Sequence, residues 1–463
     1  MLHLKTTGKD SGDLEIEVVS PSQIPLVFET ELGNILRLDK NPRMSRKEIK
    51  EKLGELLKFA IFSHRWFQEG EPSYQAVDSR RPFTRGYHKL INFCEEAARF
   101  GCKLAWSDTC CIDKTSSAEL DEAIRSMFRW YRLAHVCIVH LSDTTSISDS
   151  FDELENDVWF TRGWTLQELL APERMKFYGG DWNKLTDMDN DKDHEELMKN
   201  VSKITNIPIH DLCHFEPGSN RIRERMSWAS RRITTRTEDI AYSLIGIFDV
   251  NLPIAYGEGT WAFHRLMQVI IDRCDEWGIF AWAGSPSTHH SRTNSIPQSP
   301  ACYHLTDVSR FPIETREKVH GDTSFKLSRQ GLSLTVMIAI GDIKCEEEVD
   351  VEAPEEGPYE FTVKPSYAGP TFTTVRIQSS VSIELKGYDW AIGMLNYREV
   401  EPKGEYGKLE GQRSYVAYLL RRPTRRVESD PEEPWTRVPT DNILIVDTLF
   451  QNESREPVQG LWL

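Results

Sequence analysis

The sequence predicts an α/β fold: a parallel, doubly wound sheet with helices on both faces, then a helical extension and a separate β-rich C-terminal domain. Two observations predict the sheet. Short apolar runs at residues 59–62, 103–106, 135–141 and 175–178 are typical of buried strands, and amphipathic helical patterns lie between them. Strands that alternate with helices in this way form parallel sheets. A third observation, short strand-like runs among turns beyond residue 301, predicts the β-rich domain.

The first two segments follow from local patterns. Residues 1–55 are predicted to form an adaptor segment, with a short strand at residues 14–19 and a basic helix before residue 55. Residues 56–200 carry the α/β domain. Its helices are predicted around residues 88–100 and after Ser116, where Ser116 and Glu119 form a capping-box signature ahead of apolar positions three and four residues apart.

The rest of the chain divides by composition. Residues 201–285 are predicted to be helical, with amphipathic helices at 238–248 and 260–274. Residues 286–300 are polar and rich in Pro and Ser, which predicts a linker. Because residues 301–463 follow that linker, we expect them to be regulatory; their strands are predicted at 332–340, 371–377, 380–385, 414–420 and 442–446.

Composition excludes several classes of protein. The 463 residues contain 56 Lys and Arg against 72 Asp and Glu, a formal net charge of −16, which disfavours a nucleic-acid partner. No apolar run reaches the roughly 18 residues of a membrane span, and no apolar signal region follows the N-terminus. Nine cysteines without a C-x-x-C pair indicate free thiols in a reducing compartment, so we expect a cytoplasmic protein.

Residues 159–172 are the most informative stretch. Thr165 and Glu168 fit a capping box and Pro172 ends the short helix, so Glu168 has a purely structural interpretation. Aromatic side chains and Arg162 nevertheless crowd this helix entry, beside the carboxyl ends of the strands, where ligands bind in doubly wound sheets. A carboxylate at this position can contact a ribose or stabilise a developing positive charge. The residues alone leave both interpretations open.

Cys110 and Cys111 offer a further alternative. A nucleophilic thiol needs a lowered pKa, which a neighbouring base or helix N-terminus provides, whereas adjacent cysteines are more often packed under a loop. Neither an H-E-x-x-H motif nor paired Cys and His spacing is present, so no metal site is predicted.

Four stretches, in this order and spacing, resemble the fungal heterokaryon-incompatibility (HET) domain. They are Phe62-Ser-His-Arg-Trp66 and residues 105–114, 116–131 and 159–172; residues 231–242 and 256–259 resemble the helical extension of such proteins. Ser107 departs from the aliphatic residue usual in the family. The resemblance covers roughly residues 55–285 and implies a cytoplasmic effector of programmed cell death in fungal non-self recognition, a form of innate immunity.

The HET domain is itself similar to the Toll/interleukin receptor (TIR) domain, which implies a TIR-like, flavodoxin-like sheet. Trp164-Thr-Leu-Gln-Glu168 matches the place where enzymatic TIR domains carry a catalytic glutamate that cleaves NAD. The resemblance therefore implies that Glu168 stabilises an oxocarbenium-like transition state. NAD would be the substrate, with no metal and no separate cofactor, and the product would be ADP-ribose or a cyclic form.

The substrate-binding residues are assigned from their place beside Glu168. Arg65 is expected to hold a phosphate and Trp66 to stack on a base, although both have an alternative role as loop anchors. Asp108 and Asp113 are expected to contact ligand or to orient Arg65 or Arg162. The remaining candidates, which line the same cleft, are Ser63, His64 and Trp164.

Three hypotheses follow. The first is an NAD glycohydrolase that becomes active when HET domains self-associate, with NAD, a second copy of the chain and an upstream non-self sensor as partners. The second is a non-enzymatic death-signalling adaptor, in which the same surface is a homotypic docking face and Glu168 only caps its helix. The third is a cysteine hydrolase that uses Cys110 or Cys111.

Overall fold

The computed structural model describes most of the chain. The described residues are 1–7, 13–20, 22–39, 45–68, 70–76, 84–145, 151–274, 276–289, 294–304, 325–328, 331–345, 359–363, 374–379, 383–395, 413–424, 435–448 and 459–462. They fold into two compact units. The first comprises Met1–Pro217, Arg232–Thr234 and Tyr242–Ile247, and the second Gly218–Arg231, Thr235–Ala241 and Phe248–Leu463.

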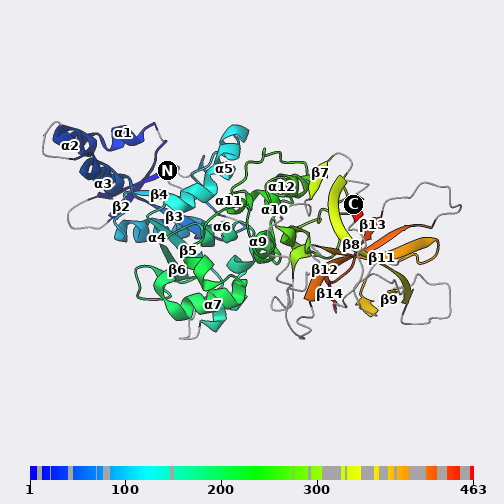
Figure 1. Ribbon diagram of the computed structural model, residues 1–463. Coiled ribbons are helices and arrows are strands. Elements are labelled where there is room, and N and C mark those ends of the chain that lie inside the picture. Colours follow the sequence, from blue (N-terminus) through cyan, green and yellow to red (C-terminus); the bar gives the residue numbers. More distant parts are fainter. Residues whose placement is uncertain are drawn as a thin grey trace, which may run out of the picture. The chain divides into compact units, whose positions relative to one another are not determined.

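The first unit is built on a six-stranded mixed sheet (Figure 1). Its strands, in the order β2-β1-β4-β3-β5-β6, are β2 (Asp13–Val18), β1 (Leu2–Thr7), β4 (Leu104–Trp106), β3 (Phe59–His64), β5 (Val136–Leu141) and β6 (Met175–Gly179). The four strands β4, β3, β5 and β6 are parallel, which confirms that part of the sequence prediction. Numbered along the chain, these four lie in the order 2-1-3-4, so the order reverses between β3 and β5.

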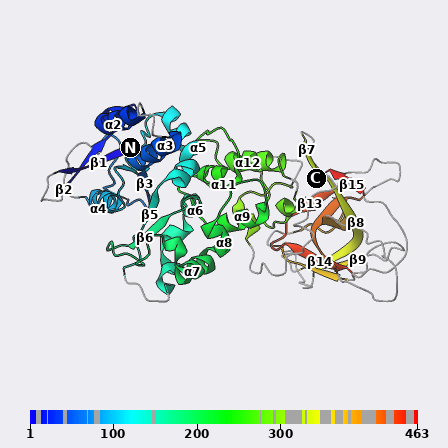
Figure 2. The same ribbon diagram turned by 60° about the vertical axis from the view of Figure 1, so that its left-hand side comes forward.

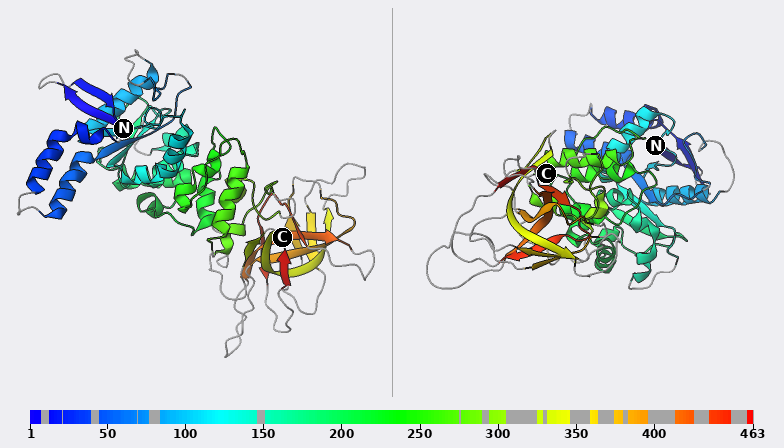
Figure 3. Two further views of the ribbon diagram at one scale, coloured as in Figure 1. Left: turned by 90° about the horizontal axis from the view of Figure 1, so that it is seen from above. Right: turned by 90° about the vertical axis from the view of Figure 1, so that its right-hand side faces the viewer.

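The expectation of a wholly parallel sheet is wrong at one edge. β1 pairs antiparallel with both β2 and β4, so that β1 and β2 extend the sheet on the free side of β4. The sequence predicts only the second of these two strands. Helices α2 (Glu29–Asp39) and α3 (Arg46–Leu57) follow α1 (Ile24–Val27) and lie side by side (Figure 3).

Helices cover both faces of the sheet, as predicted. Phe93 of α4 (Arg85–Arg99) stacks on Phe62 of β3 with ring centroids 4.4 Å apart. On the opposite face Tyr131 of α5 (Ser117–Leu133) donates to the Phe62 carbonyl at 2.8 Å. Ser116 caps α5 by accepting from the Glu119 amide, as the sequence predicts.

The remaining elements up to residue 280 are mostly short helices. They are η1 (Asp152–Asn156), η2 (Val158–Thr161), α6 (Thr165–Leu170), η3 (Asp191–Asp193), α7 (Glu195–Thr205), α8 (Ile209–Cys213), α9 (Ile222–Ala229), α10 (Asp239–Tyr242), α11 (Ile245–Phe248), α12 (Trp261–Ile271) and η4 (Trp277–Phe280). The helix predicted at 238–248 is therefore two short helices, whereas the helix predicted at 260–274 is confirmed as α12.

The segment whose composition predicts a linker contains ordered structure in its described residues. Pro286 and Pro297 form an antiparallel bridge, and the Ser287 amide donates to the Ile296 carbonyl at 2.8 Å. Ile296 is buried. The short helix η5 (Pro300–Tyr303) follows directly.

The C-terminal part of the second unit is a nine-stranded antiparallel sheet. Its strands are β7 (Lys326–Ser328), β8 (Gly331–Cys345), β9 (Tyr359–Val363), β10 (Thr374–Ile377), β11 (Tyr388–Leu395), β12 (Arg413–Pro423), β13 (Thr436–Val438), β14 (Leu444–Thr448) and β15 (Gln459–Trp462). The main order is β10-β9-β8-β11-β12-β13, with β14 paired to β12, and β7 and β15 paired to β8. The long strand β8 curves along this sheet (Figure 2). The prediction that the C-terminal part is rich in β-strands is confirmed.

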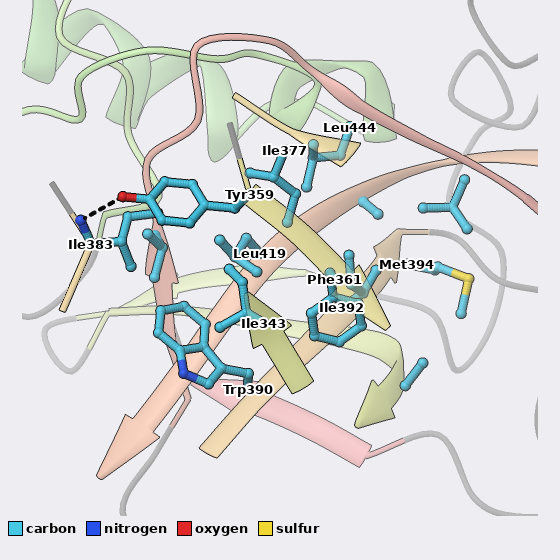
Figure 4. Close-up of a cluster of buried hydrophobic side chains, with 14 of the residues drawn as sticks. Ile343, Tyr359, Phe361, Ile377, Ile383, Trp390, Ile392, Met394, Leu419 and Leu444 are labelled. Carbon is cyan, nitrogen blue, oxygen red and sulfur yellow. Dashed lines mark hydrogen bonds between the residues drawn. The ribbon is translucent and has the colours of Figure 1, made fainter. Parts of the chain in front are cut away.

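One of its predicted strands is wrong where the structure describes it. Residues 380–382 lie outside the described residues, and residues 383–385 form no strand because their backbone groups bind side chains. The Ile383 amide donates to the Tyr359 hydroxyl at 3.1 Å, and the Leu385 carbonyl accepts from the Trp390 indole at 3.3 Å. The Ile383–Tyr359 bond lies in the buried cluster around Trp390 and Phe361 (Figure 4), and Leu385 packs against that cluster. No helix in the described part of the chain is long and apolar enough to cross a bilayer.

Candidate active site at the carboxyl edge of the parallel strands

Glu168 does not cap its own helix. Thr165 is the first residue of α6, and the N-cap residue, Trp164, makes no side-chain capping bond. The Thr165 hydroxyl instead lies 2.6 Å from the Trp159 carbonyl and 2.9 Å from the Arg162 carbonyl. The capping-box interpretation of Thr165 and Glu168 is therefore wrong, because the threonine hydroxyl is committed to the preceding loop.

The Glu168 carboxyl points to the end of β3 instead. The Ser63 hydroxyl donates to Glu168 Oε2 at 2.5 Å, and Ser63 Oγ in turn accepts from the Trp159 indole N–H at 2.9 Å. Ser63 and Trp159 are fully buried, and Glu168 is 7% exposed. The site thus lies where the strand order reverses, which is where doubly wound sheets bind their ligands.

The environment favours the neutral form of Glu168. Burial raises the pKa of its carboxyl to about 8, and the negative charge of Asp108 acts in the same direction. The hydrogen bond from Ser63, the nearby hydroxyl of Tyr131 and the positive charge of Arg162 oppose this rise. A strongly raised pKa beside a specific set of partners is typical of functional sites.

Arg232 lies next to the same helix entry although it is distant in sequence. Its guanidinium donates to the Thr165 hydroxyl and to the Arg162 carbonyl, both at 2.9 Å. Burial lowers the pKa of Arg232, and the Glu168 carboxylate raises it. Arg162 and Ile233 form a parallel bridge, so residues 232–234 hold the start of α6 from outside the domain boundary predicted at residue 200.

The loop after β3 carries Arg65 and Trp66 at the same edge. Arg65 forms an exposed ion pair with Asp143, which follows β5, at 3.2 Å. The Trp66 indole N–H donates to Asp108, which follows β4, at 2.9 Å. Lys114 lies 3.7 Å from the centre of the Trp66 ring, which is 43% exposed.

His64 and the two aspartates have different surroundings from Ser63. Adjacent residues in a strand point to opposite faces, so His64 lies on the α4 side, with its Nε2 3.5 Å from Asp108. Burial lowers the pKa of His64, with help from Lys89. Burial alone would raise the pKa of Asp108, but the adjacent His64, the positive charge of Lys114 and the hydrogen bond from the Trp66 indole lower it. Asp113 binds Thr115 and Gln75, so neither aspartate orients Arg65 or Arg162 among the described contacts.

A buried ion pair fixes the loop after β3. Lys89 of α4 pairs with Glu71 and donates to the Arg65 carbonyl at 2.9 Å. Its ammonium also lies 3.8 Å from the centre of the Phe67 ring, and Glu71 accepts from the Phe67 amide at 2.8 Å. One ammonium group therefore holds three points of the loop that presents Arg65 and Trp66.

The structure brings the predicted residues together in two groups. Ser63, Glu168, Arg162 and the partly buried Trp164 lie at the α6 side, and the other predicted residues lie on or near the loop after β3: His64, Arg65, Trp66 and Asp108. Asp113 is farther along the loop after β4. The sequence did not identify Trp159, Tyr131 or Arg232 as site residues, because each contacts the site through a partner far away in the chain.

This arrangement of side chains is suited to binding a ligand that carries a planar ring, an anionic group and a developing positive charge. A buried carboxyl is held by a serine hydroxyl, and an exposed indole and an exposed guanidinium lie at the same edge of the sheet. Such groups respectively stabilise a developing positive charge, stack on a planar ring and bind an anion.

Comparisons with known proteins point to one family. Residues 59–152 match the family model described as heterokaryon incompatibility protein (HET). The chain is also 43% identical over 228 residues to the vegetative incompatibility protein HET-E-1 of Podospora anserina, an alignment that covers 47% of this chain and 16% of the relative. The chain thus spans about a sixth of the length of the curated relative it matches. No solved structure matches.

Proposed function

We propose that this chain, whose residues 59–152 match the heterokaryon-incompatibility (HET) family model, is a cytoplasmic cell-death effector of fungal non-self recognition that cleaves NAD. The support for a death role is the similarity to a vegetative incompatibility protein. The support for NAD cleavage is the place of Glu168: a carboxyl on the helix after the third parallel strand, turned to the strand end that a TIR-like sheet uses.

The single observation that carries the proposal is the Ser63–Glu168 bond. A glutamate that merely capped α6 would bind its own backbone, whereas this one crosses 105 residues of sequence to a buried serine. Burying a carboxyl costs free energy. A carboxyl that is buried in spite of this cost is often one that the function of the protein requires. The capping role that the adaptor hypothesis gives to Glu168 therefore has no support in the described contacts.

In the proposed reaction the bond between the ribose C1′ and the nicotinamide nitrogen breaks, and its electron pair leaves with nicotinamide. The Glu168 carboxylate stabilises the positive charge that develops on the ribose. Water then adds to C1′ and releases a proton, which gives ADP-ribose; capture by a group of the substrate itself gives a cyclic product. Arg65 binds a phosphate and Trp66 stacks on a base.

The raised pKa of Glu168 couples ionisation to binding. In the free chain much of Glu168 is protonated at neutral pH. The pyridinium cation of NAD favours the carboxylate, so substrate binding releases the proton. A second copy of the chain that completes the site has the same effect if it adds positive charge beside Glu168. This is how we expect self-association, triggered by an upstream sensor, to activate the domain.

One observation favours the second candidate, a non-enzymatic adaptor. Glu168 is only 7% exposed, so in the single chain its carboxyl is sequestered by Ser63 rather than open to a ligand. The adaptor hypothesis requires no ligand at this place. The two candidates differ in whether the carboxylate, rather than the shape of the residue, is needed for killing.

Expression of the full chain in yeast separates them. Wild-type protein is expected to lower the cellular NAD pool and viability, and Glu168→Gln is expected to lose both effects while accumulating to the same level. The control is Glu173→Gln, which makes the same chemical change at an exposed position five residues later. Killing by Glu168→Gln with an unchanged NAD pool would instead establish the adaptor.

A further inference from the structure

We propose that Cys111 is an oxidation site: a peroxide oxidises its sulfur, and Cys110 then closes a disulfide with it. The two cysteines lie in the turn that follows β4. The proposal concerns the thiols as a modification site and does not depend on the NAD reaction.

The first support is the difference in exposure between the two thiols. As a whole residue Cys111 is partly exposed and packs against the core cluster beneath the loop, whereas Cys110 is fully buried and belongs to that cluster, together with Cys94. Of the two residues, Cys111 is therefore the nearer to solvent. Cys110, its neighbour in sequence, is held where it can react only with a sulfur already beside it.

The second support is the hydrogen bonding of the Cys111 sulfur. The Ser107 amide donates to Cys111 Sγ at 3.4 Å, and the Cys111 amide returns a bond to the Ser107 carbonyl at 2.8 Å. Burial raises the pKa of Cys111, but the Cys110 thiol, the positive charge of the N-terminus and the Ser107 amide together outweigh it and lower the pKa to about 7. Donors aimed at a sulfur stabilise the thiolate, the reactive form.

The other thiols serve as internal references. Burial raises the pKa of Cys94, Cys102, Cys137, Cys213 and Cys302, and a hydrogen bond to Cys111 together with burial raises that of Cys110. Cys213 is the most useful of them, because it is partly exposed like Cys111 but lacks the lowered pKa. Exposure alone therefore does not set Cys111 apart.

The chemistry balances with peroxide as the oxidant. The Cys111 thiolate attacks one peroxide oxygen, the O–O bond breaks, and the products are the Cys111 sulfenic acid and hydroxide. The Cys110 thiol then attacks the sulfenic sulfur, a sulfur–sulfur bond forms, and water leaves with the Cys110 proton. Overall two thiols are oxidised and one peroxide is reduced to water.

The disulfide is expected to be strained and easily reduced. Adjacent Cα atoms are about 3.8 Å apart, whereas disulfide-bonded residues are usually separated by about 4.4–6.8 Å. Closing the ring must therefore distort the turn that Ser107 and Cys111 close. Asp108 lies in that turn and holds Trp66, so oxidation is expected to release the Trp66 indole. Strained disulfides are the labile, reversible ones.

Tryptic mapping of the peroxide-treated full chain tests the proposal. Cys110 and Cys111 share the fragment between Lys103 and Lys114, whereas Cys94 lies in a different fragment, between Lys89 and Arg99. The expected product is the 104–114 fragment lighter by two hydrogens, restored by a thiol reductant. At pH 7 we expect Cys111 to react about tenfold or more faster than Cys213.

Variants locate the first step. In Cys110→Ser, oxidation is expected to stop at a Cys111 sulfenic acid that dimedone traps, and in Cys111→Ser the fragment is expected to stay unmodified. Cys102→Ser, at another buried thiol, is the control for a change in the core. A Cys111 that reacts no faster than Cys213 in the wild-type chain would overturn the proposal, as would a linked pair of fragments that joins Cys94 to Cys111.

Discussion

Glu168 is a carboxyl whose protonation depends on its surroundings. Ser63 and Trp159 form a buried hydrogen-bonded chain with it, yet burial still raises the pKa of its carboxyl to about 8. The free chain therefore holds a neutral acid at the place where the proposed chemistry needs an anion. The positive charge of a cationic substrate stabilises the carboxylate form of Glu168. Substrate binding and ionisation of Glu168 are therefore expected to occur together.

The same pKa predicts how stability varies with pH. Below about pH 4.3, the usual glutamate value, Glu168 is protonated in both the folded and the unfolded chain. Between that value and about 8 the folded chain keeps a proton that the unfolded chain has lost. The contribution of Glu168 to the free energy of unfolding is therefore lost as pH rises, by up to about 1.4 kcal/mol per pH unit.

Glu168→Gln removes this dependence. Urea unfolding at pH 5 and pH 8 is expected to show that the wild-type chain loses stability relative to the variant as the pH rises. Equal changes in the two proteins would mean that Glu168 is already ionised in the folded chain at pH 5.

Sequence reasoning identifies some site residues and not others for a physical reason. Ser63 follows from its place at a strand end, and Glu168 follows from the resemblance to HET and TIR domains. Trp159 reaches Ser63 across 96 residues and Arg232 reaches Thr165 across 67, and no local pattern specifies such contacts. The Thr165 and Glu168 spacing misleads because the hydroxyl of a distant residue, Ser63, replaces the backbone N–H as the hydrogen-bond donor to Glu168.

At the scale of elements, α4 and the loop after β3 form one unit. A Cβ at Gly86, in the first turn of α4, would lie 2.3 Å from the Gly70 carbonyl oxygen. Thr84, the N-cap of α4, donates to that same oxygen at 2.6 Å. The helix start and the loop that carries Arg65 and Trp66 are therefore packed backbone against backbone.

Gly86→Ala is expected to destabilise the fold by about 1–3 kcal/mol, because the added methyl group must displace backbone rather than a flexible side chain. The matched control is Gly54→Ala in α3, where a Cβ meets nothing within 4 Å. Alanine there is expected to stabilise by about 0.5–1 kcal/mol, since glycine loses more entropy in a helix. Free energies of unfolding measured in urea test whether Gly86→Ala is destabilised and Gly54→Ala is stabilised. A Gly86→Ala variant as stable as wild type would show that the loop shifts freely.

Lys89 gives a second prediction for the same loop. Lys89→Met keeps the aliphatic stem but leaves the partly buried carboxylate of Glu71 without its partner, which costs about 1–3 kcal/mol. Hydrogen exchange of residues 65–71 is expected to speed up in the variant, while exchange in α5 changes in proportion to global stability only. Unchanged exchange in the loop would show that other contacts hold it.

At this scale the sequence predicts the parallel strands well, because each is a short apolar run between amphipathic helices. It misses β1, whose alternating His3 and Lys5 give it the polarity of a loop. It also treats residues 286–300 as a linker from Pro and Ser content, although Ser287 and Ile296 pair there. Amino-acid composition does not predict backbone pairing between two short polar segments.

In the whole molecule, the proposed active site lies in the first unit and the β-rich sheet lies in the second. If self-association completes the site, the rate of NAD cleavage per molecule is expected to rise with protein concentration and then level off. Sedimentation velocity at the same concentrations is expected to show oligomers over the same range. A rate per molecule that stays constant while oligomers form would separate activity from assembly.

Nicotinamide release by the purified full chain tests the central claim most directly. Wild-type protein and Glu168→Gln are incubated with NAD at matched, self-associating concentrations, and products are separated by chromatography. The account predicts nicotinamide and an ADP-ribose product from the wild-type chain, and a loss of at least a hundredfold in Glu168→Gln, as expected when a group that stabilises transition-state charge is removed. Equal release by the two proteins, or none from wild-type protein shown to be self-associated, would contradict it.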